Sequence, residues 1–251
     1  MGVAIQCNAF RFRLPGKAKT LIVTPKISVM PRFLSRILFF TALQLCLGNL
    51  AMAASVIQLP LPVIDGNLSL EQTLTHRRSV RAFASKALDV AQISQLLWAA
   101  QGITGQGSYR TAPSAGALYP LELYLVAGLV DGLQPGVYHY RPSENTLIHS
   151  AVGDRRAALR EAALGQSALT NAPAVVVICG VFERTTVKYG HRGDRYVHME
   201  AGHAAQNLAL QAVALGLASV PIGAFGDAKV QQALALPPNA QPLYLLPVGW
   251  P

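Results

Sequence analysis

The densest group of residues able to do chemistry is Arg77-Arg78-Ser79-Val80-Arg81. Guanidinium groups bind phosphate oxygens in pairs, and a serine hydroxyl adds a further donor. The cluster therefore predicts a binding site for one phosphate monoester. The alternative is a solvent-exposed basic turn without a ligand. The sequence contains no G-x-G-x-x-G after a predicted strand and no G-x-x-x-x-G-K-[ST]. A single cluster of this kind suits one terminal phosphate, which favours FMN over FAD or NAD as the cofactor.

A second polar group, His198, Glu200 and His203, invites comparison with helical metal sites. Such sites place two histidines four residues apart on one helix face. Offsets of 0, 2 and 5 residues instead put these side chains at about 0°, 200° and 140° around a helix. We therefore expect no metal site, and interpret His203 as a hydrogen-bonded residue and Glu200 as a structural one. Cys179, in the apolar run 175–179, is expected to be a buried packing residue.

The elements that must position these residues form an α+β arrangement over residues 69–251, without an internal repeat. Helices are predicted over 69–78, 89–102, 154–164, 196–217 and 227–234, and strands over 122–127, 136–141, 146–149, 174–180 and 242–248. Ser69 with Gln72 resembles a capping box, and Asp89 is a good N-cap. Loops are expected over 102–120 and 219–226. Residues 54–68 are Pro-rich and are expected to form an extended arm.

Most of the net positive charge of the chain comes from residues 1–53. Seven of the 21 Lys and Arg residues lie in residues 1–53, which contain no Asp or Glu, so 14 basic and 12 acidic residues remain in 54–251. The formal charge of +9 therefore gives no support to nucleic-acid binding, and the basic-aromatic patches of such proteins are missing. With 51% hydrophobic and 13% charged residues, the chain is suited to a buried core and not to disorder.

Residues 30–53 have the layout of a Sec-type signal peptide. Arg32 and Arg36 precede an apolar run over 37–50, and Ala51-Met52-Ala53 supplies small residues for signal peptidase. The alternative, a membrane-spanning helix, needs about 20 apolar residues, more than this run contains. We expect cleavage after Ala53, a periplasmic or secreted protein, and no stable membrane anchor. Translation is expected to start at Met30, with residues 1–29 an extension outside the natural protein.

Six short segments occur in a characteristic order along residues 69–251. They are 77–83, 96–103, 113–120 (Pro-Ser-Ala-Gly-Ala-Leu-Tyr-Pro), 199–208, 221–225 (Pro-Ile-Gly-Ala-Phe) and 247–251. In this order they resemble the nitroreductase superfamily of FMN oxidoreductases, and within it the SagB/ThcOx type of dehydrogenase, named for oxidation of thiazoline and oxazoline rings in modified peptides. The resemblance implies an α+β fold with a central, mostly antiparallel sheet, packed helices and a long buried central helix.

The resemblance also implies a homodimer that holds FMN noncovalently at the subunit interface. The cofactor-binding residues that it implies fall into three groups. Arg77, Arg78, Ser79 and Arg81 would hold the phosphate and ribityl chain; Pro113, Ser114, Ala115, Gly116 and Ala117 would come from the partner subunit and lie along the flavin; Pro221, Ile222, Gly223 and Ala224 would approach the opposite edge of the ring. Small residues suit this role because backbone N–H groups must come close to flavin atoms.

Lys188 and Tyr189 are the catalytic residues that the resemblance implies. In the peptide-oxidising members a Lys-Tyr pair at this position is implicated in catalysis, and either group could move protons beside a flavin. The alternative is a loop lysine and a packing tyrosine. Arg192 and Arg195 are expected to pair with Asp194 in a loop before the long helix. Two further residues, Arg110 and Tyr119, are weaker candidates for substrate contacts.

Together these implications predict an exported FMN-dependent oxidoreductase that transfers hydride through flavin N5 to or from a small molecule or peptide azoline. Two alternatives stay open: a non-catalytic flavin-binding or accessory protein of the same fold, and a flavin-free structural relative. The chain departs from many simple nitroreductases because it ends at Trp250-Pro251 without a basic residue that reaches the FMN phosphate. Export would also separate the enzyme from NAD(P)H, so another electron donor or onward electron transfer is expected.

Overall fold

A computed structural model describes residues 55–105, 107 and 109–251. The signal peptide predicted over 30–53, its cleavage site and the alternative start at Met30 lie outside the described residues. The strands are β1 (Val56–Gln58), β2 (Leu88–Asp89), β3 (Leu121–Ala127), β4 (Val130–Asp131), β5 (Gly136–Arg141), β6 (Thr146–Val152), β7 (Ala174–Gly180), β8 (Ala218–Ser219) and β9 (Gln241–Gly249). Seven of them form a sheet in the order β1-β6-β5-β3-β7-β9-β8, with every neighbouring pair antiparallel. The predicted α+β fold with an antiparallel central sheet is confirmed.

The helices are α2 (Leu70–His76), α3 (Val90–Gln101), a short 3₁₀ turn (Ala115–Ala117), α4 (Arg156–Ala162), α5 (Ala168–Asn171), α6 (Glu183–Tyr189), α7 (Arg192–Ala214) and α8 (Asp227–Leu234). Both predicted caps are present: the side chains of Ser69 and Asp89 each accept a hydrogen bond from the backbone N–H three residues later. The side-chain oxygen of the glutamine at that position accepts one from the backbone N–H of the cap residue. α3 ends at Gly102, as predicted. Among the helices that the structure describes, none is long and apolar enough to span a bilayer.

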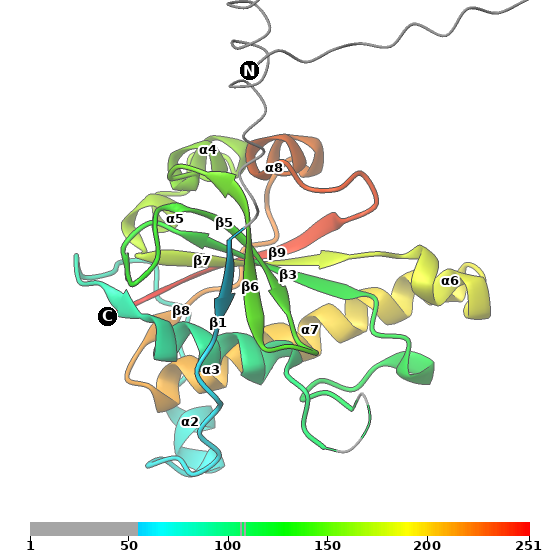
Figure 1. Cartoon of the computed structure of the whole chain (residues 1–251), viewed down its shortest axis with the longest axis horizontal. Coiled ribbons are helices and arrows are strands. Elements are labelled where there is room, and N and C mark those ends of the chain that lie inside the picture. Colours follow the sequence, from blue (N-terminus) through cyan, green and yellow to red (C-terminus); the bar gives the residue numbers. More distant parts are fainter. Residues whose placement is uncertain (1–54, 106, 108) are drawn as a thin grey trace, which may run out of the picture. The chain divides into compact units, whose positions relative to one another are not determined.

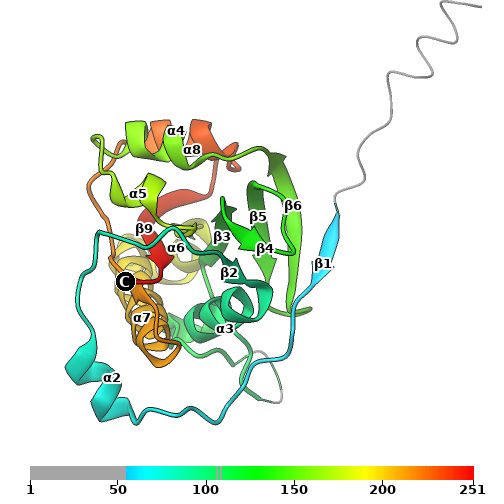
Figure 2. The same ribbon diagram turned by 90° about the vertical axis from the view of Figure 1, so that its left-hand side faces the viewer.

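Helices cover both faces of the sheet (Figures 1 and 2). α3 and α7 pack on one face, where Leu97 and Leu208 belong to one buried core. α4, α5 and α8 pack on the other face, where Leu159, Leu169 and Val230 belong to a second core. Because both faces are covered, successive residues of β7 enter alternate cores and all seven are buried. This explains why β7 is a continuous apolar run without polar alternation. Cys179 lies in β7 as a buried free thiol, as predicted.

Several boundaries differ from the predictions. α7 begins at Arg192, four residues earlier than predicted, and Gly193 in its first turn packs closely on the backbone of Thr186. Lys188 and Tyr189 lie in α6, a helix that the sequence did not predict. The arm over residues 54–68 contains β1, which pairs with β6 at the sheet edge. The loop predicted over 219–226 begins instead with the end of β8.

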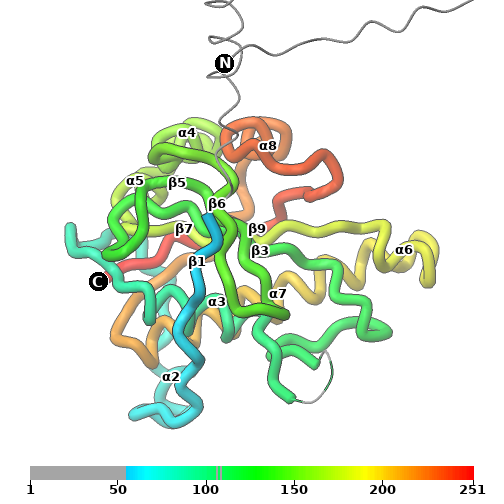
Figure 3. The backbone as a smooth tube through the Cα atoms, in the orientation of Figure 1, coloured from blue at the N-terminus to red at the C-terminus, as the bar shows by residue number. Residues whose placement is uncertain are grey.

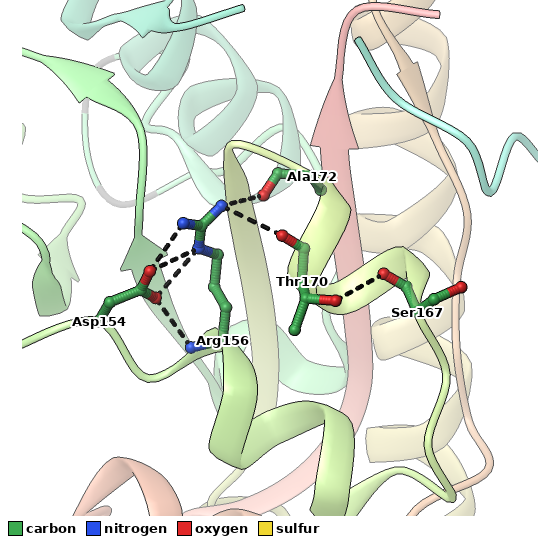
Figure 4. Close-up of polar contacts among 5 residues, drawn as sticks. All are labelled: Asp154, Arg156, Ser167, Thr170 and Ala172. Carbon is green, nitrogen blue, oxygen red and sulfur yellow. Dashed lines mark hydrogen bonds and ion pairs between the residues drawn. The ribbon is translucent and has the colours of Figure 1, made fainter. Parts of the chain in front are cut away.

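Arg156 holds the end of α4 against the segment between α5 and β7 (Figure 4). Its guanidinium pairs with Asp154 at 2.7 Å and donates to the carbonyl oxygen of Ala172 at 2.7 Å and of Thr170 at 3.4 Å. The ion pair lowers the pKa of Asp154 below its usual range. Gly128 is required beside this group because a Cβ there would overlap the Arg156 guanidinium.

Candidate functional site

The predicted phosphate site lies where the chain leaves α2 and passes β8. The backbone N–H of Val80 donates to the carbonyl oxygen of Ser219 at 3.1 Å, and Ser79 forms a parallel bridge with Ser219. This pairing brings the arginine cluster beside the segment 221–224. Two groups far apart in the sequence, both predicted to bind the cofactor, therefore lie together.

The side chains of this cluster are available to an anion. Arg78 and Arg81 are exposed, and Arg77 is half-buried. Arg78 donates to the carbonyl oxygens of Thr75 and Arg77. None of the ion pairs within the described part of the chain involves these three arginines. The guanidinium groups therefore present positive charge without a carboxylate that would compete with a phosphate.

The segment 221–224 offers a ligand mostly backbone and small side chains. Pro221, Gly223 and Ala224 are exposed. Ile222 is buried in the second core, and its backbone exchanges hydrogen bonds of 2.8 and 3.0 Å with Leu245. Ile222 thus anchors the segment to β9, and its side chain points away from any ligand on the surface.

The second predicted group forms around the 113–117 loop. Gly116 has φ +62°, a left-handed conformation that favours glycine. A Cβ at this position would lie 2.7 Å from the hydroxyl oxygen of Tyr189 and 2.9 Å from Nζ of Lys188. The structure therefore brings both predicted catalytic side chains directly against the middle of the loop predicted to line the cofactor.

α6, which carries Lys188 and Tyr189, is fixed to the end of this loop by Arg184. The Arg184 guanidinium donates to the carbonyl oxygen of Tyr119 at 3.1 Å and forms an ion pair with Glu122 at the start of β3. Glu122 also contacts Nε2 of His139 at 2.6 Å. Burial alone would raise the pKa of Glu122, but the hydrogen bonds with His139 and Arg184 outweigh burial and lower it. Arg184 and Glu122 thus set the position of α6 relative to the loop.

A buried polar network lies beneath the loop, and sequence reasoning did not assign it to the site. Gln101 donates to Oε1 of Glu200 at 3.4 Å and accepts a hydrogen bond from Arg110 at 3.0 Å. Glu200 is only 2% exposed. Burial raises its pKa to about 7, although hydrogen bonds from Ser114 and Gln101 and the charge of Arg110 act in the opposite direction.

The signal for Glu200 is its place on the apolar stripe of α7. It lies three residues after Val197 and four before Ala204, and both of these side chains are fully buried. Residues at these spacings share one helix face. An acidic residue within such a stripe must be buried, and a buried acid needs partners.

Arg110 and Tyr119, the weaker substrate-contact candidates, lie at the two ends of the loop and contact one another. The Arg110 guanidinium stacks over the Tyr119 ring at 4.7 Å. Nε of Arg110 is buried and has no hydrogen-bond partner among the described residues. Both residues are therefore part of the support of the loop.

Other polar residues near α7 do not gather as a site. Arg192 and Arg195 were predicted to pair with Asp194 in a loop, and this is wrong because all three lie within α7 and form no ion pair there. Glu200 is buried whereas His203 is exposed, although the two residues are three apart on α7 and border one cavity. Among the described residues, no three His, Cys, Asp or Glu side chains are placed to hold a metal ion.

The two groups lie near opposite ends of α7. Lys188 and Tyr189 precede α7, and the arginine cluster pairs with Ser219, which follows it (Figures 1 and 3). With 23 residues, α7 is about 35 Å long at roughly 1.5 Å per residue.

Several known proteins are similar to this chain in sequence or in fold. A protein of Methanocaldococcus jannaschii described as a nitroreductase is 43% identical over 192 residues, which cover 76% of this chain and 96% of that protein. A structure described as a nitroreductase from Anabaena variabilis is 31% identical with a TM-score of 0.70, and the match covers 79% of this chain and 42% of that one.

Proteins of the Escherichia coli microcin B17 system are also similar. The microcin B17-processing protein McbC is 33% identical over 155 residues, 59% of this chain and 57% of McbC. A chain of the microcin synthetase McbBCD complex with truncated pro-MccB17 bound gives a TM-score of 0.61 at 26% identity, over 90% of this chain and 84% of that one. Residues 74–250 match the nitroreductase family, and this range includes the arginine cluster, the 113–117 loop and Lys188 with Tyr189. The chain belongs to the nitroreductase family.

Proposed function

We propose that this nitroreductase-family oxidoreductase is an exported FMN-dependent enzyme that transfers hydride to or from a small molecule or a peptide azoline. The observation that carries the proposal is the contact of Lys188 and Tyr189 with Gly116. Three residues from two distant segments meet there, and each was assigned to the catalytic or cofactor site by the resemblance to flavin enzymes.

The residues present fit FMN. The exposed guanidinium groups of Arg78 and Arg81, with half-buried Arg77, would hold the phosphate through charge-assisted hydrogen bonds. At Gly116 the missing side chain lets Lys188 and Tyr189 approach the loop backbone, and exposed Gly223 and Ala224 offer backbone to a flat ring beside the arginines. Bound there, FMN would supply hydride transfer through its N5 atom.

A homodimer would complete the site. The arginine cluster and Lys188 lie toward opposite ends of α7, a helix about 35 Å long, and this supports a second copy as the source of the 113–117 loop for an FMN held by the first. We propose that two copies exchange these groups, so that each of two equivalent sites combines the arginines of one protomer with the loop of the other.

Lys188 and Tyr189 would act on protons of the substrate in this site. Lys188 Nζ and the Tyr189 hydroxyl can hold or accept a proton at the substrate atom next to the carbon that exchanges hydride. Similarity to McbC, a microcin B17-processing protein, and to a complex with truncated pro-MccB17 supports a peptide as one class of substrate. Small molecules are the other class.

Export is supported by the signal-like sequence over residues 30–53. NAD(P)H is a cytoplasmic reductant, so an exported enzyme requires another electron donor or passes electrons onward. N-terminal sequencing of the protein from a periplasmic fraction tests this part, and the proposal predicts a chain that begins at Ala54. A mature chain that retains residues 30–53 would contradict export by cleavage.

Stopped-flow reduction and reoxidation of the FMN-loaded protein tests the catalytic proposal. Lys188→Ala and Tyr189→Phe are each expected to lower turnover by about 100-fold, the usual loss for a proton-transfer group, without loss of bound flavin. Val187→Ala is the matched control, because Val187 is 88% exposed on the same helix. Turnover equal to wild type in both active-site variants would contradict the roles of Lys188 and Tyr189. An FMN-loaded protein that no donor reduces would instead indicate a non-catalytic flavin-binding protein.

A further inference from the structure

The buried acid Glu200 lies at a position from which it can fix the whole 113–117 loop. It borders a cavity of about 250 Å³ that is lined by Pro113, Ser114 and Ala115 of the loop and by Tyr196, Met199 and His203 of α7. The cavity lies between the loop and α7, and the polar groups around Glu200 contribute to the contact between them. Glu200 is 2% exposed, which places its carboxyl group at the base of the cavity.

Hydrogen bonds connect Glu200 to the loop region through Gln101. Gln101 donates to Glu200 at 3.4 Å and accepts a hydrogen bond from Arg110 at 3.0 Å, and the Arg110 guanidinium stacks over the Tyr119 ring at 4.7 Å. Ser114 borders the same cavity as Glu200, and its hydroxyl oxygen accepts the backbone N–H of Tyr119 at 2.9 Å. Glu200 is therefore the side chain of α7 through which this polar network supports the loop.

The backbone of the loop needs such support. Gly116, Ala117 and Tyr119 all have φ between +46° and +62°. For a residue with a Cβ this left-handed conformation costs about 1–2 kcal/mol, and it persists only where surrounding contacts determine it. Ala117 and Tyr119 are two such residues, and the backbone N–H of each donates a hydrogen bond to Ser114. Ala117 donates to the Ser114 carbonyl oxygen at 3.1 Å, and Tyr119 donates to the hydroxyl oxygen.

We propose that Glu200, in its protonated form, is the positioning residue that holds the 113–117 loop closed against α7 in the conformation that receives the flavin. Opening of the loop would admit water to the carboxyl group and return it to an ordinary acid, so ionisation favours the open loop. Burial in the closed loop acts in the same direction, because it favours the protonated carboxyl group and raises the pKa of Glu200 to about 7. The other titratable groups around it are Arg110 from the loop and Tyr196 and His203 from α7; α3 contributes uncharged Gln101.

Amide hydrogen exchange in the FMN-free protein tests this inference directly. The reporters are the amides of Ala117 and Tyr119, whose bonds to Ser114 depend on the loop. After correction for intrinsic exchange, protection in the wild type is expected to fall about tenfold between pH 6 and pH 8.5, as linkage to an acid of this pKa requires. Glu200→Gln, which stays neutral, should keep the protection at both pH values. Glu200→Leu removes the hydrogen-bond partner and should lower protection about tenfold at both.

Glu161→Gln on α4 makes the same chemical change at an exposed position and should behave as the wild type. Unchanged protection of Ala117 and Tyr119 in Glu200→Leu would overturn the inference. If Glu200→Leu does not fold, Glu200→Gln tests the inference on its own. The amides of Ala117 and Tyr119 should then be more protected from exchange in Glu200→Gln than in the wild type at pH 8.5. Equal protection in the two proteins would overturn the inference.

The consequence for flavin rests on the proposed function and is measured separately. The Kd for FMN is expected to rise about tenfold in Glu200→Leu and to match the wild type at pH 6 in Glu200→Gln. A wild-type protein that binds no FMN would refute the proposed function. The role of Glu200 in loop closure would not be affected, because the exchange experiment measures it without FMN. Loss of loop protection in Glu200→Leu without any change in the FMN Kd would overturn the link between the loop and the cofactor.

Discussion

Replacement of Glu200 by glutamine should change the pH dependence of the free energy of unfolding. In the folded protein burial raises the pKa of Glu200 from 4.5 to about 7. Its contribution to stability is therefore fully present below pH 4.5 and is lost as the pH rises through 7, because the folded state has to release a proton that it binds more tightly. Each pKa unit is worth about 1.4 kcal/mol, so the loss approaches about 3 kcal/mol above pH 7.

Urea denaturation of the wild type and Glu200→Gln from pH 4.5 to pH 8, at one protein concentration, measures this effect. Other groups titrate in the same range, so the informative quantity is the difference between the two proteins at each pH. We expect this difference to move by about 3 kcal/mol in favour of the glutamine variant across the range. Glu161→Gln, on the exposed face of α4, should show no such movement. A difference between wild type and Glu200→Gln that stays constant with pH would refute the argument that folded Glu200 retains a proton.

Three further predictions concern other parts of the structure. Gly116→Ala and Gly165→Ala both place a Cβ at positive φ, and each should lower the free energy of unfolding by about 1–2 kcal/mol. Only Gly116→Ala displaces Lys188 and Tyr189, so only this variant should lower turnover, by tenfold or more. Equal turnover in the two variants would contradict the contact of Gly116 with Lys188 and Tyr189. Arg78→Ala combined with Arg81→Ala should remove bound FMN, measured as flavin released per chain, because a phosphate deprived of charge-assisted partners is poorly held; unchanged flavin content would refute their assignment. Gly128→Ala forces the guanidinium behind it out of its hydrogen bonds and should destabilise the fold by about 1.5–3 kcal/mol in urea denaturation; wild-type stability would show that this guanidinium can move freely.

The sequence predicts the parts of the fold that local interactions determine. Capping boxes at Ser69 and Asp89 identify where α2 and α3 begin, since the cap and its partner are three residues apart. The apolar run of β7 identifies a strand with both faces covered. By contrast, the pairing of β8 with β9 depends on contacts between distant residues, and two-residue strands leave no periodic pattern.

The missed helix α6 and the missed role of Glu200 have related causes. α6 contains the β-branched residues Thr185, Thr186 and Val187, which are weak helix formers, and only Thr185 is buried. No apolar stripe marks it, and the close packing of Gly193 on its backbone is a tertiary contact. Glu200 is visible in the sequence as an acid on a buried stripe, but the loop that it supports is 86 residues away along the chain and is brought to it only by folding.

We propose that this chain binds FMN through the arginine cluster and the 113–117 loop. The visible absorption spectrum of the purified protein, after incubation with FMN and removal of free flavin by gel filtration, measures this binding. We expect flavin absorbance to elute with the protein in an amount stoichiometric with the chain. A colourless protein that retains no flavin would contradict it.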